Sequence, residues 1–351
     1  LLRSGMLPVN MPRSAIVTDP VFLKHEPGPY HPENPQRIKT LLDLAGEVTG
    51  GGDRFELLPL RAAAQAELEL CHGSDYIDLV RSTSAHNRFA LDGDTITCRD
   101  SFGVALMAVG GFLQLLDAVA ASDYGNGFTM ARPPGHHALR NRGMGFCLFN
   151  TVAIGARYLQ EKHGARRVAI MDWDVHHGNG SQDAFYDDPS VLFLSTHQYP
   201  YYPGTGAADE AGSGRGEGYT VNVPLPAGCG DAEYLAVFRD IIVPAIERYE
   251  PDWLLVSAGF DSHRDDPLAA MGVTEQGFGV MANALLELAR KHTGGKIAFL
   301  LEGGYDLAAL RNSVATVLEC MQSEEAASFE ASGERIATRI REVLQIHERY
   351  R

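Results

Sequence analysis

The sequence lacks the features that mark several classes of protein. Its five cysteines are scattered and form no CxxC pair, which argues against a disulfide framework and fits a reducing compartment. No apolar run reaches the ~20 residues that a membrane span needs. Like charges form no block, and the formal net charge of −15 argues against nucleic acid or an anionic membrane as the main partner. We therefore expect a cytoplasmic protein whose acidic surface tolerates a basic ligand.

What the sequence does contain is enough apolar material for one large domain. The chain has 351 residues, 45% of them hydrophobic, with no internal repeat, low-complexity stretch or linker-like change in composition. Residues 1–14 have no apolar segment typical of a signal peptide. We expect them to be a leader or residues added for expression. Residues 15–351 are expected to form a single domain.

Short apolar runs alternate with helix-like segments along most of the chain. The expected strands are 15–18, 128–131, 168–171, 191–195, 220–223, 253–257 and 297–301. The expected helices are 35–50, 74–82, 101–121, 151–163, 231–248, 274–292 and 324–351, with Asn150 and Asp231 as N-caps. This alternation predicts an α/β fold in which helices cover both faces of a doubly wound, mostly parallel sheet.

The stretch 168–180, VAIMDWDVHHGNG, joins an expected buried strand to a cluster of carboxylates and imidazoles. Open α/β sheets bind their ligands at the carboxyl edge, which is where such a strand delivers its last residues. Polar residues also follow other expected strands, namely His136, His137, Asp261 and Tyr305. Because the carboxyl ends of parallel strands meet at one edge, we expect these side chains to converge.

Asp174, His176 and Asp261 are the expected metal ligands. Alternate residues of extended backbone share a face, so Asp174 and His176 point the same way. Two carboxylates and one imidazole leave an open coordination position, as in catalytic zinc sites. The oxygen-rich set also suits Fe(II), Co(II) or Mn(II). The alternative for Asp261 is an Asx-turn after Gly259.

The adjacent His136 and His137 suit acid–base chemistry beside such a metal. Their side chains diverge unless the backbone turns sharply, and the Pro-Pro-Gly of residues 133–135 supplies that turn. Asp172 and Asn179 are the nearby groups that could fix the imidazole tautomers. The alternative, a buried histidine with only a structural role, is reasonable for either ring alone and weak for both.

Three aromatic residues sit in glycine-rich loops. Tyr305 follows two glycines, and its hydroxyl could polarise a carbonyl and stabilise an oxyanion opposite the metal. Phe146 and Tyr202 could face each other across a narrow apolar tunnel suited to a methylene chain. The alternatives are a core or rim position for Tyr305 and ordinary loop packing for the other two.

Six motifs, in this order, resemble the zinc-dependent histone deacetylase family: RPPGHHA, GFCLFN, DWDVHHGNG, YPGTG, SAGFDSHRDDPL and LEGGYDL. The similarity spans about residues 24–317 and is greatest to the class II-like branch that includes bacterial deacetylase-like amidohydrolases. It implies the arginase/deacetylase fold, with about eight strands in the sheet. It also implies a zinc-dependent hydrolase that removes acetyl or another short acyl group from the N-ε amine of lysine in proteins or peptides.

The same resemblance implies roles for single residues. The zinc ligands would be Asp174, His176 and Asp261. The catalytic residues would be His136, His137, Tyr305, Asp172 and Asn179. Among these, His137 would be the general base that activates water at the metal, His136 would assist, and Tyr305 would hold the oxyanion.

Further sites follow from the resemblance alone. A first K⁺ would be held by Asp172, Asp174, His176, Ser195 and Thr196, and a second by backbone oxygens of Phe185, Asp188, Val191 and Tyr219. The substrate would be contacted by Phe146, Tyr202, Leu268 and Gly304. Arg37 matches a position that lines the family's acetate-exit channel.

Three positions separate subclasses of the family. Asn179 stands where class I members carry aspartate, which weakens the partner of His137. Tyr305 is present where the nearly inactive class IIa branch has histidine, so turnover is expected. Leu268 stands where the polyamine-specific class IIb branch has a glutamate, which favours acetylated lysine over a small acetylated amine. An acetylpolyamine amidohydrolase, a silent acetyl-lysine binding module and an oligomeric state all stay open.

Overall fold

Eight strands form the central sheet of the computed structural model, which describes residues 13–323, 327–328 and 334–349. The strand order is β2-β1-β5-β10-β9-β6-β7-β8, and every neighbouring pair is parallel. The strands are β1 (Ser14–Val17), β2 (Phe55–Leu57), β5 (Asn126–Thr129), β6 (Val168–Asp172), β7 (Val191–Gln198), β8 (Thr220–Leu225), β9 (Trp253–Ala258) and β10 (Ile297–Leu301). The prediction of an α/β fold with one parallel sheet is confirmed.

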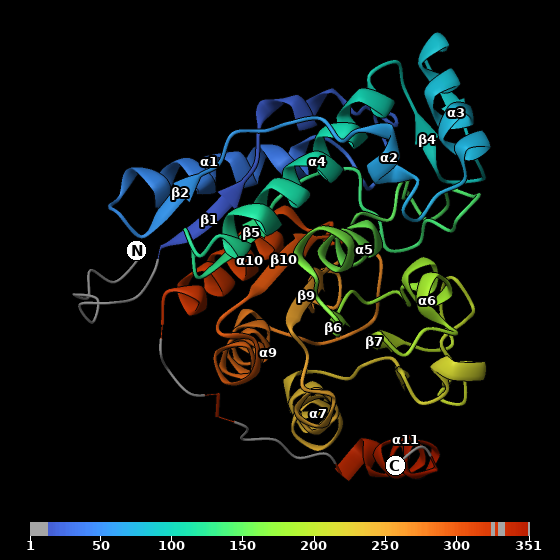
Figure 1. Cartoon of the computed structure of the whole chain (residues 1–351), viewed down its shortest axis with the longest axis vertical. Coiled ribbons are helices and arrows are strands. Elements are labelled where there is room, and N and C mark those ends of the chain that lie inside the picture. Colours follow the sequence, from blue (N-terminus) through green and yellow to red (C-terminus); the bar gives the residue numbers. More distant parts are fainter. Residues whose placement is uncertain (1–12, 324–326, 329–333, 350–351) are drawn as a thin grey trace.

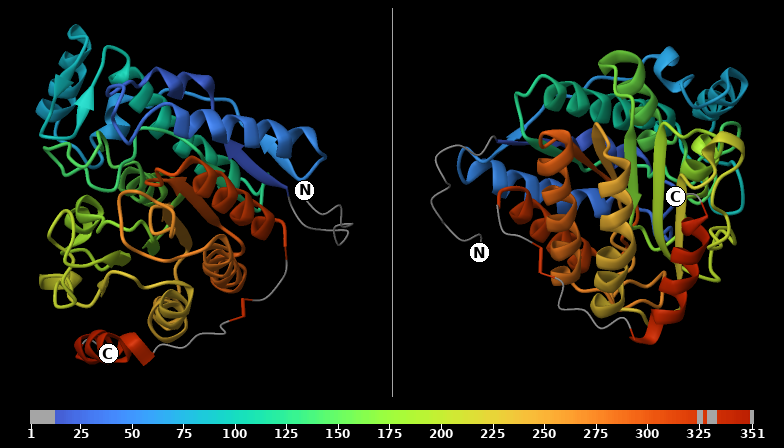
Figure 2. Two further views of the ribbon diagram at one scale, coloured as in Figure 1. Left: turned by 180° about the vertical axis from the view of Figure 1, so that it is seen from behind. Right: turned by 60° about the horizontal axis from the view of Figure 1, so that its bottom comes forward.

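Helices cover both faces of this sheet (Figures 1 and 2). The helices α3, α4 and α5 pack on one face, and α1, α7, α9, α10 and α11 pack on the other. Their bounds are α1 (Gln36–Gly50), α2 (Gln65–Leu68), α3 (Ser74–Ser82), α4 (Ser101–Ala120), α5 (Thr151–His163), α6 (Asn179–Phe185), α7 (Asp231–Val237), α8 (Val243–Tyr249), α9 (Glu275–Leu288), α10 (Leu307–Met321) and α11 (Ala337–Glu348). A two-stranded antiparallel ribbon, β3 (Phe89–Ala90) and β4 (Ile96–Thr97), lies outside the main sheet.

Strand β6 shows why the central strands are continuous apolar runs. Val168 and Ile170 point into the core under α4 and α5, whereas Ala169 and Met171 point into the core under the opposite helices. All four are fully buried. A strand covered on both faces has no solvent side, so its sequence does not alternate between apolar and polar residues. The run ends at Asp172, the last residue of the strand, where the sheet reaches its carboxyl edge.

Helix α4 corrects one expectation from the sequence. It spans 20 residues and is long and apolar enough to cross a membrane by length and composition, although no such run was expected. In the fold it packs against β1, β5 and α5, and most of it is buried. Its apolar character is therefore that of a core helix.

The expected helix 231–248 is interrupted, and its expected cap is wrong. Between α7 and α8 lies a π-helical segment, Phe238–Ile242. Gly230 occupies the N-cap position of α7, and the Asp231 carboxylate instead accepts hydrogen bonds from the backbone N–H and the hydroxyl of Thr274, at 2.8 and 2.6 Å. Asp231 thus ties the start of α7 to the start of α9.

Other boundaries differ at the ends of the chain. The first strand begins at Ser14, inside the expected leader, and residues 1–12 lie outside the described residues. The strand β2 and the helix α10 were not expected from the sequence. The expected helix 324–351 is observed as α11 from Ala337, preceded by a 3₁₀ turn, and residues 324–326, 329–333 and 350–351 of that expectation lie outside the described residues. The predicted cap of α5 is confirmed, because the Asn150 side chain accepts the N–H of Ala153 at 3.0 Å.

Candidate active site

Three potential metal donors converge just beyond the carboxyl ends of β6 and β9. Asp174, His176 and Asp261 each place a ligand atom within 4.8 Å of the others. The Asp174 Oδ1 and Asp261 Oδ2 atoms lie 3.2 and 3.1 Å from Nδ1 of His176. The structure therefore brings together the three residues expected to bind a metal, and the expectation of an isolated Asx-turn at Asp261 is not needed.

Backbone donors hold these carboxylates in place. The second oxygen of Asp174 accepts the N–H of Gly303 at 2.8 Å, and the second oxygen of Asp261 accepts the N–H of Val175 at 2.8 Å. A Cβ at Gly303 would lie 2.2 Å from an Asp261 oxygen, so only glycine allows the segment after β10 to approach this closely. Each carboxylate thus uses one oxygen for the fold and directs the other toward His176, an arrangement typical of metal ligands.

The electrostatics of these three residues favour a cation. Burial and the charge of Asp174 raise the pKa of Asp261 to about 7. Burial alone would lower the pKa of His176, but its contacts with Asp174 and Asp261 raise it to about 10. Within the described chain, no arginine or lysine forms an ion pair with either carboxylate. The donor set therefore fits a divalent ion, which competes with a proton for the same place.

Two adjacent histidines lie beside the metal donors, and each is hydrogen-bonded to another side chain. The Nδ1 atom of His136 lies 3.0 Å from Asp172, and Nδ1 of His137 lies 2.8 Å from the side-chain oxygen of Asn179. The centroids of the two imidazoles are 4.0 Å apart, so the turn before them does bring both rings to one place. A ring whose Nδ1–H donates to its partner presents Nε2 as the atom available for proton transfer.

Burial and neighbouring charges shift the pKa values of the two imidazoles in opposite directions. Burial disfavours a charge on His136, but the carboxylates of Asp172 and Asp174 outweigh it and raise its pKa well above the ordinary value. Burial lowers the pKa of His137 well below the ordinary value, and the charges of His136 and His176 lower it further. The pKa values of the two imidazoles are therefore shifted in opposite directions, which is how acid and base roles are divided between adjacent groups.

Glu302 is a buried part of the site that the sequence reasoning missed. Its Oε2 atom accepts the backbone N–H groups of Gly135 and His136 at 2.6 and 3.2 Å. Burial raises the pKa of this carboxyl to about 7. Glu302 directly follows β10 and precedes the glycines before Tyr305, so the rule that sends polar strand ends to the site would have identified it.

Tyr305 is held by two elements distant in sequence. Its backbone N–H donates to Asp266 at 2.6 Å. The guanidinium of Arg37 lies 4.9 Å from the centroid of the Tyr305 ring and donates to the carbonyls of Gly304 and Glu302 at 2.6 and 2.5 Å. Burial raises the pKa of the Tyr305 phenol well above its ordinary value, so the hydroxyl keeps its proton. In the structure Arg37 anchors this loop, and its expected place along an exit channel stays a prediction.

The two aromatic residues expected to form a tunnel lie beside His137 and Tyr305. The ring of Tyr202 lies edge-on to His137 at 5.2 Å, and the ring of Phe146 lies edge-on to Tyr305 at 5.9 Å. Tyr201, which was not expected to take part, stacks on His176 at 5.7 Å and donates its hydroxyl to the carbonyl of Leu268 at 2.7 Å. The substrate-contacting roles expected for these residues stay predictions.

Comparisons with known proteins agree with this geometry. A family model described as "Histone deacetylase domain" matches residues 31–321. The chain belongs to the histone deacetylase family. It is 42% identical over 296 residues to a probable deacetylase of Archaeoglobus fulgidus, covering 84% of this chain and 82% of the relative. It is 41% identical to histone deacetylase 10, chloroplastic, of Oryza sativa subsp. japonica over 84% of this chain and 70% of that protein.

A solved structure shows the same fold. The crystal structure of the HDA15 HD domain superposes with a TM-score of 0.90 at 36% identity, covering 96% of this chain and 95% of that chain. The arginase/deacetylase fold and the family's activity, hydrolysis of an amide bond by a deacetylase, are therefore shown for this chain. The two relatives named above are archaeal and plant proteins, so the expected similarity to bacterial enzymes and the expected cytoplasmic location stay predictions.

Other expected residues of this histone deacetylase domain have varied surroundings. The hydroxyl of Ser195 lies 2.9 Å from Nδ1 of His197, and the Thr196 hydroxyl is buried without a hydrogen-bond partner among the described residues. Gly304 has a φ of +117°, and a Cβ there would lie 3.0 Å from Phe260. His177, which was not expected to bind metal, contacts a hydroxyl and an amide oxygen through its two nitrogens, at 2.8 and 3.0 Å.

The second expected potassium site involves backbone carbonyls that already have partners. The carbonyls of Phe185, Asp188 and Tyr219 accept backbone N–H groups at 3.0, 3.4 and 2.9 Å. A carbonyl oxygen has two lone pairs, so these contacts leave room for an ion. Both potassium sites stay predictions.

Proposed function

We propose that this chain is a zinc-dependent deacylase that removes acetyl or another short acyl group from the N-ε amine of lysine in proteins or peptides. The observation that supports it best is the convergence of Asp174, His176 and Asp261 beside the adjacent imidazoles of His136 and His137, whose centroids are 4.0 Å apart. Zn²⁺ at these donors would supply Lewis acidity, which polarises a carbonyl and makes water more acidic.

The side chains then have separate tasks. Neutral His137 accepts a proton from the attacking water through Nε2, while Asn179 keeps its other nitrogen oriented. The hydroxyl of Tyr305 donates to the oxygen on which charge develops. His136, charged next to Asp172, stabilises negative charge in the site, and a protonated imidazole of the pair supplies the proton that the leaving amine needs.

The chain positions its substrate with aromatic rings. Tyr202 and Phe146 lie beside His137 and Tyr305, so an acyl-lysine side chain would pass between them with its amide at the metal donors. The half-exposed Leu268 offers no carboxylate to a cationic substrate. These contacts favour an uncharged methylene chain ending in an amide.

A second candidate, an acetylpolyamine amidohydrolase, is supported by an acidic pair near Tyr202. Asp92 and Asp94 lie close enough for their charges to raise the pKa of Tyr202, after burial as the main cause. The adjacent Thr95 accepts the N–H of Phe146 at 3.1 Å. Steady-state rates on an acetyl-lysine peptide and on an acetylpolyamine, measured side by side, decide between the two; a higher kcat/KM for the polyamine would replace the first candidate.

The variant Tyr305→Phe tests the mechanism. Loss of one donor to an oxyanion lowers kcat by roughly 10²- to 10³-fold. Metal content, measured by elemental analysis, should stay at the wild-type level because no metal donor changes. Tyr30→Phe is the matched control, since Tyr30 is 97% exposed and should leave turnover unchanged. Near-wild-type turnover of Tyr305→Phe would contradict the proposed role.

A further inference from the structure

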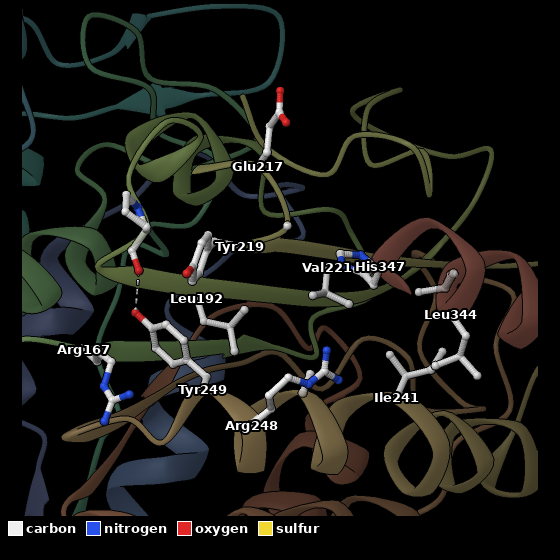
Figure 3. A pocket seen from close by; sticks show the side chains of 14 residues that line it. Arg167, Leu192, Glu217, Tyr219, Val221, Ile241, Arg248, Tyr249, Leu344 and His347 are labelled. Atoms are coloured by element: carbon white, nitrogen blue, oxygen red, sulfur yellow. Dashed lines mark hydrogen bonds between the residues drawn. The ribbon is translucent and has the colours of Figure 1, made fainter. Parts of the chain in front are cut away.

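A cavity outside the candidate active site lies on the face of β7 and β8 that is opposite to α4 and α5. It has a volume of about 240 Å³ and is bounded by the two strands, by the segment that includes α8, and by α11 (Figure 3). Its lining shares no residue with Asp174, His176, Asp261, the two adjacent histidines or Tyr305, although it includes Tyr219, which was expected at the second potassium site. The cavity is therefore separate from the candidate active site.

The floor and one wall of this cavity are apolar. Leu192 and Val221 contribute from the neighbouring strands β7 and β8, Ile241 from the segment before α8, and Val343 and Leu344 from α11. Most of these side chains are buried in the core under α11. A surface of this kind accepts an aliphatic or aromatic body.

Arginines line the opposite side, in a chain of net charge −15. Figure 3 shows Arg248 reaching from α8 toward the space between Tyr249 and Leu344. Arg248 forms no hydrogen bond or ion pair with the described residues, whereas Arg167 has a loose pair, at 3.8 Å, with the exposed Glu250. A guanidinium beside an apolar floor is suited to a carboxylate, which it can bind through two parallel hydrogen bonds.

We propose that this cavity binds a small amphipathic carboxylic acid, with its apolar body on Leu192, Val221 and Leu344 and its carboxylate on Arg248. Glu217 lies on the rim, with its carboxylate directed away from Arg248 in Figure 3. The Glu217 carboxylate and the net negative charge of the chain disfavour a ligand that carries several negative charges, such as a polyphosphate. A single carboxylate satisfies Arg248 without adding further charge.

Calorimetric titration of the full chain with sodium octanoate tests the proposal. The wild type should bind octanoate saturably, and 1-octanol, which has the same body without the charge, at least tenfold more weakly. Arg248→Gln should weaken octanoate binding at least tenfold. The matched control is Arg239→Gln, an exposed arginine that precedes Arg248 in the same helical segment and does not line the cavity; it should stay within twofold of the wild type.

A second variant separates the other outcomes. Leu344→Trp fills the cavity from α11 and should abolish octanoate binding while leaving deacetylase turnover unchanged. Octanoate binding that both Arg248→Gln and Leu344→Trp leave intact would place the ligand elsewhere, including the deacetylase site, and would overturn the proposal. Absence of saturable octanoate binding would overturn it too. Concentration-dependent dimerisation that Leu344→Trp removes, without octanoate binding, would identify a second copy of the chain as the occupant instead.

Discussion

Two buried acidic clusters lie within the same fold and are neutralised in different ways. In one, Glu33 is fully buried and its two oxygens accept from Arg132, both at 2.6 Å, while Arg37 donates to it at 3.1 Å. Burial would raise the pKa of Glu33, yet the charge of Arg132 and the contacts with His25 hold it well below the ordinary value. In the other cluster, Asp174 and Asp261 have only imidazoles as ion-pair partners in the described chain.

The difference distinguishes a cluster that stabilises the fold, which we call a brace, from a cluster that can bind a metal. The Glu33 cluster contains its own cations, so it is complete and has no capacity to bind another. It also joins the two loops of the active site: Arg132 directly precedes the turn to His136, and Arg37 holds the loop of Tyr305. The Asp174 cluster has only titratable imidazoles as cationic partners in the described chain, so a metal ion can replace their protons and balance the carboxylates. One cluster fixes the geometry that the other uses.

The largest expected effect comes from Asp261→Asn in the second cluster. The amide keeps an oxygen for the N–H of Val175 but loses the charge that a metal ligand needs, so metal should be lost and turnover should fall by about 10³-fold or more. In chelator-treated protein the same change should leave stability unchanged or raise it, because it removes one of two repelling buried carboxylates. Elemental analysis, steady-state rates and urea unfolding measure the three effects.

The exposed Asp265, four residues further on, provides the control for that experiment. Asp265→Asn should retain metal and turnover because the ion pairs of this carboxylate among the described residues are with His263 and Arg264, at 3.7 and 3.8 Å. Retention of stoichiometric metal by Asp261→Asn would remove Asp261 from the ligand set. A marked loss of stability in the chelated variant would show that the cluster is a brace like the other one.

The same acid-to-amide change in the first cluster should have the opposite effect on stability. Glu33→Gln leaves Arg132 and Arg37 buried with a neutral partner, which should cost about 3 kcal/mol of unfolding free energy. Glu67→Gln is the control: Glu67 also binds an arginine through two oxygens, at 2.7 and 2.8 Å, but nearer the surface, and should cost about 1 kcal/mol. Urea unfolding measures both, and equal losses would contradict the role given to burial.

These two clusters also show what the sequence could predict. The donors Asp174, His176 and Asp261 follow apolar strands, and the topology of a parallel sheet is enough to bring them to one edge. Glu33 follows no strand, and it meets Arg132 across 99 positions through loops whose path a single sequence does not define. The role of Glu302 depends on the same kind of contact, because its partners lie 166 and 167 positions earlier.

The helices show a similar limit. The sequence placed α3 and α5 correctly, and α5 has clear ends, with Asn150 before it and the left-handed Gly164 after it. The π-helical segment before α8 does have a local signal, because Pro244 in the first turn of α8 has no N–H to donate and its ring clashes with the carbonyl four residues earlier. Asp231 has the chemistry of an N-cap, but tertiary contact with Thr274 uses its carboxylate.

A smaller effect is expected at His72, a buried imidazole that supports the active-site loops without a charged partner. Its Nε2 atom accepts the N–H of Asn150 at 2.9 Å, and burial lowers its pKa to about 4 from an ordinary 6.5. The unfolded chain binds the proton more readily, so the stabilising contribution is full above pH 6.5 and falls as the pH drops toward 4. Between pH 7.5 and 5 the wild type should lose about 2 kcal/mol from this residue.

The variant His72→Gln isolates that contribution. Glutamine can accept the same N–H without titrating, so its stability should depend less on pH over this interval than that of the wild type, by about 2 kcal/mol. Urea unfolding at several pH values gives the comparison. Parallel pH profiles for the two proteins would show that His72 is not kept neutral by the fold.

The smallest effect is expected where an ion pair lies in solvent. Lys291 and Glu247 are 2.5 Å apart, a distance similar to those in the Glu33 cluster, but their side chains are 60% and 41% exposed. Water and salt screen such a pair, and its formation orders two long side chains, so Glu247→Gln should change the unfolding free energy by at most about 1 kcal/mol. Raising the salt concentration should reduce that difference further while leaving the loss in Glu33→Gln almost unchanged. If both variants responded equally to salt, the distinction between a buried and an exposed ion pair would not explain the stability of this fold.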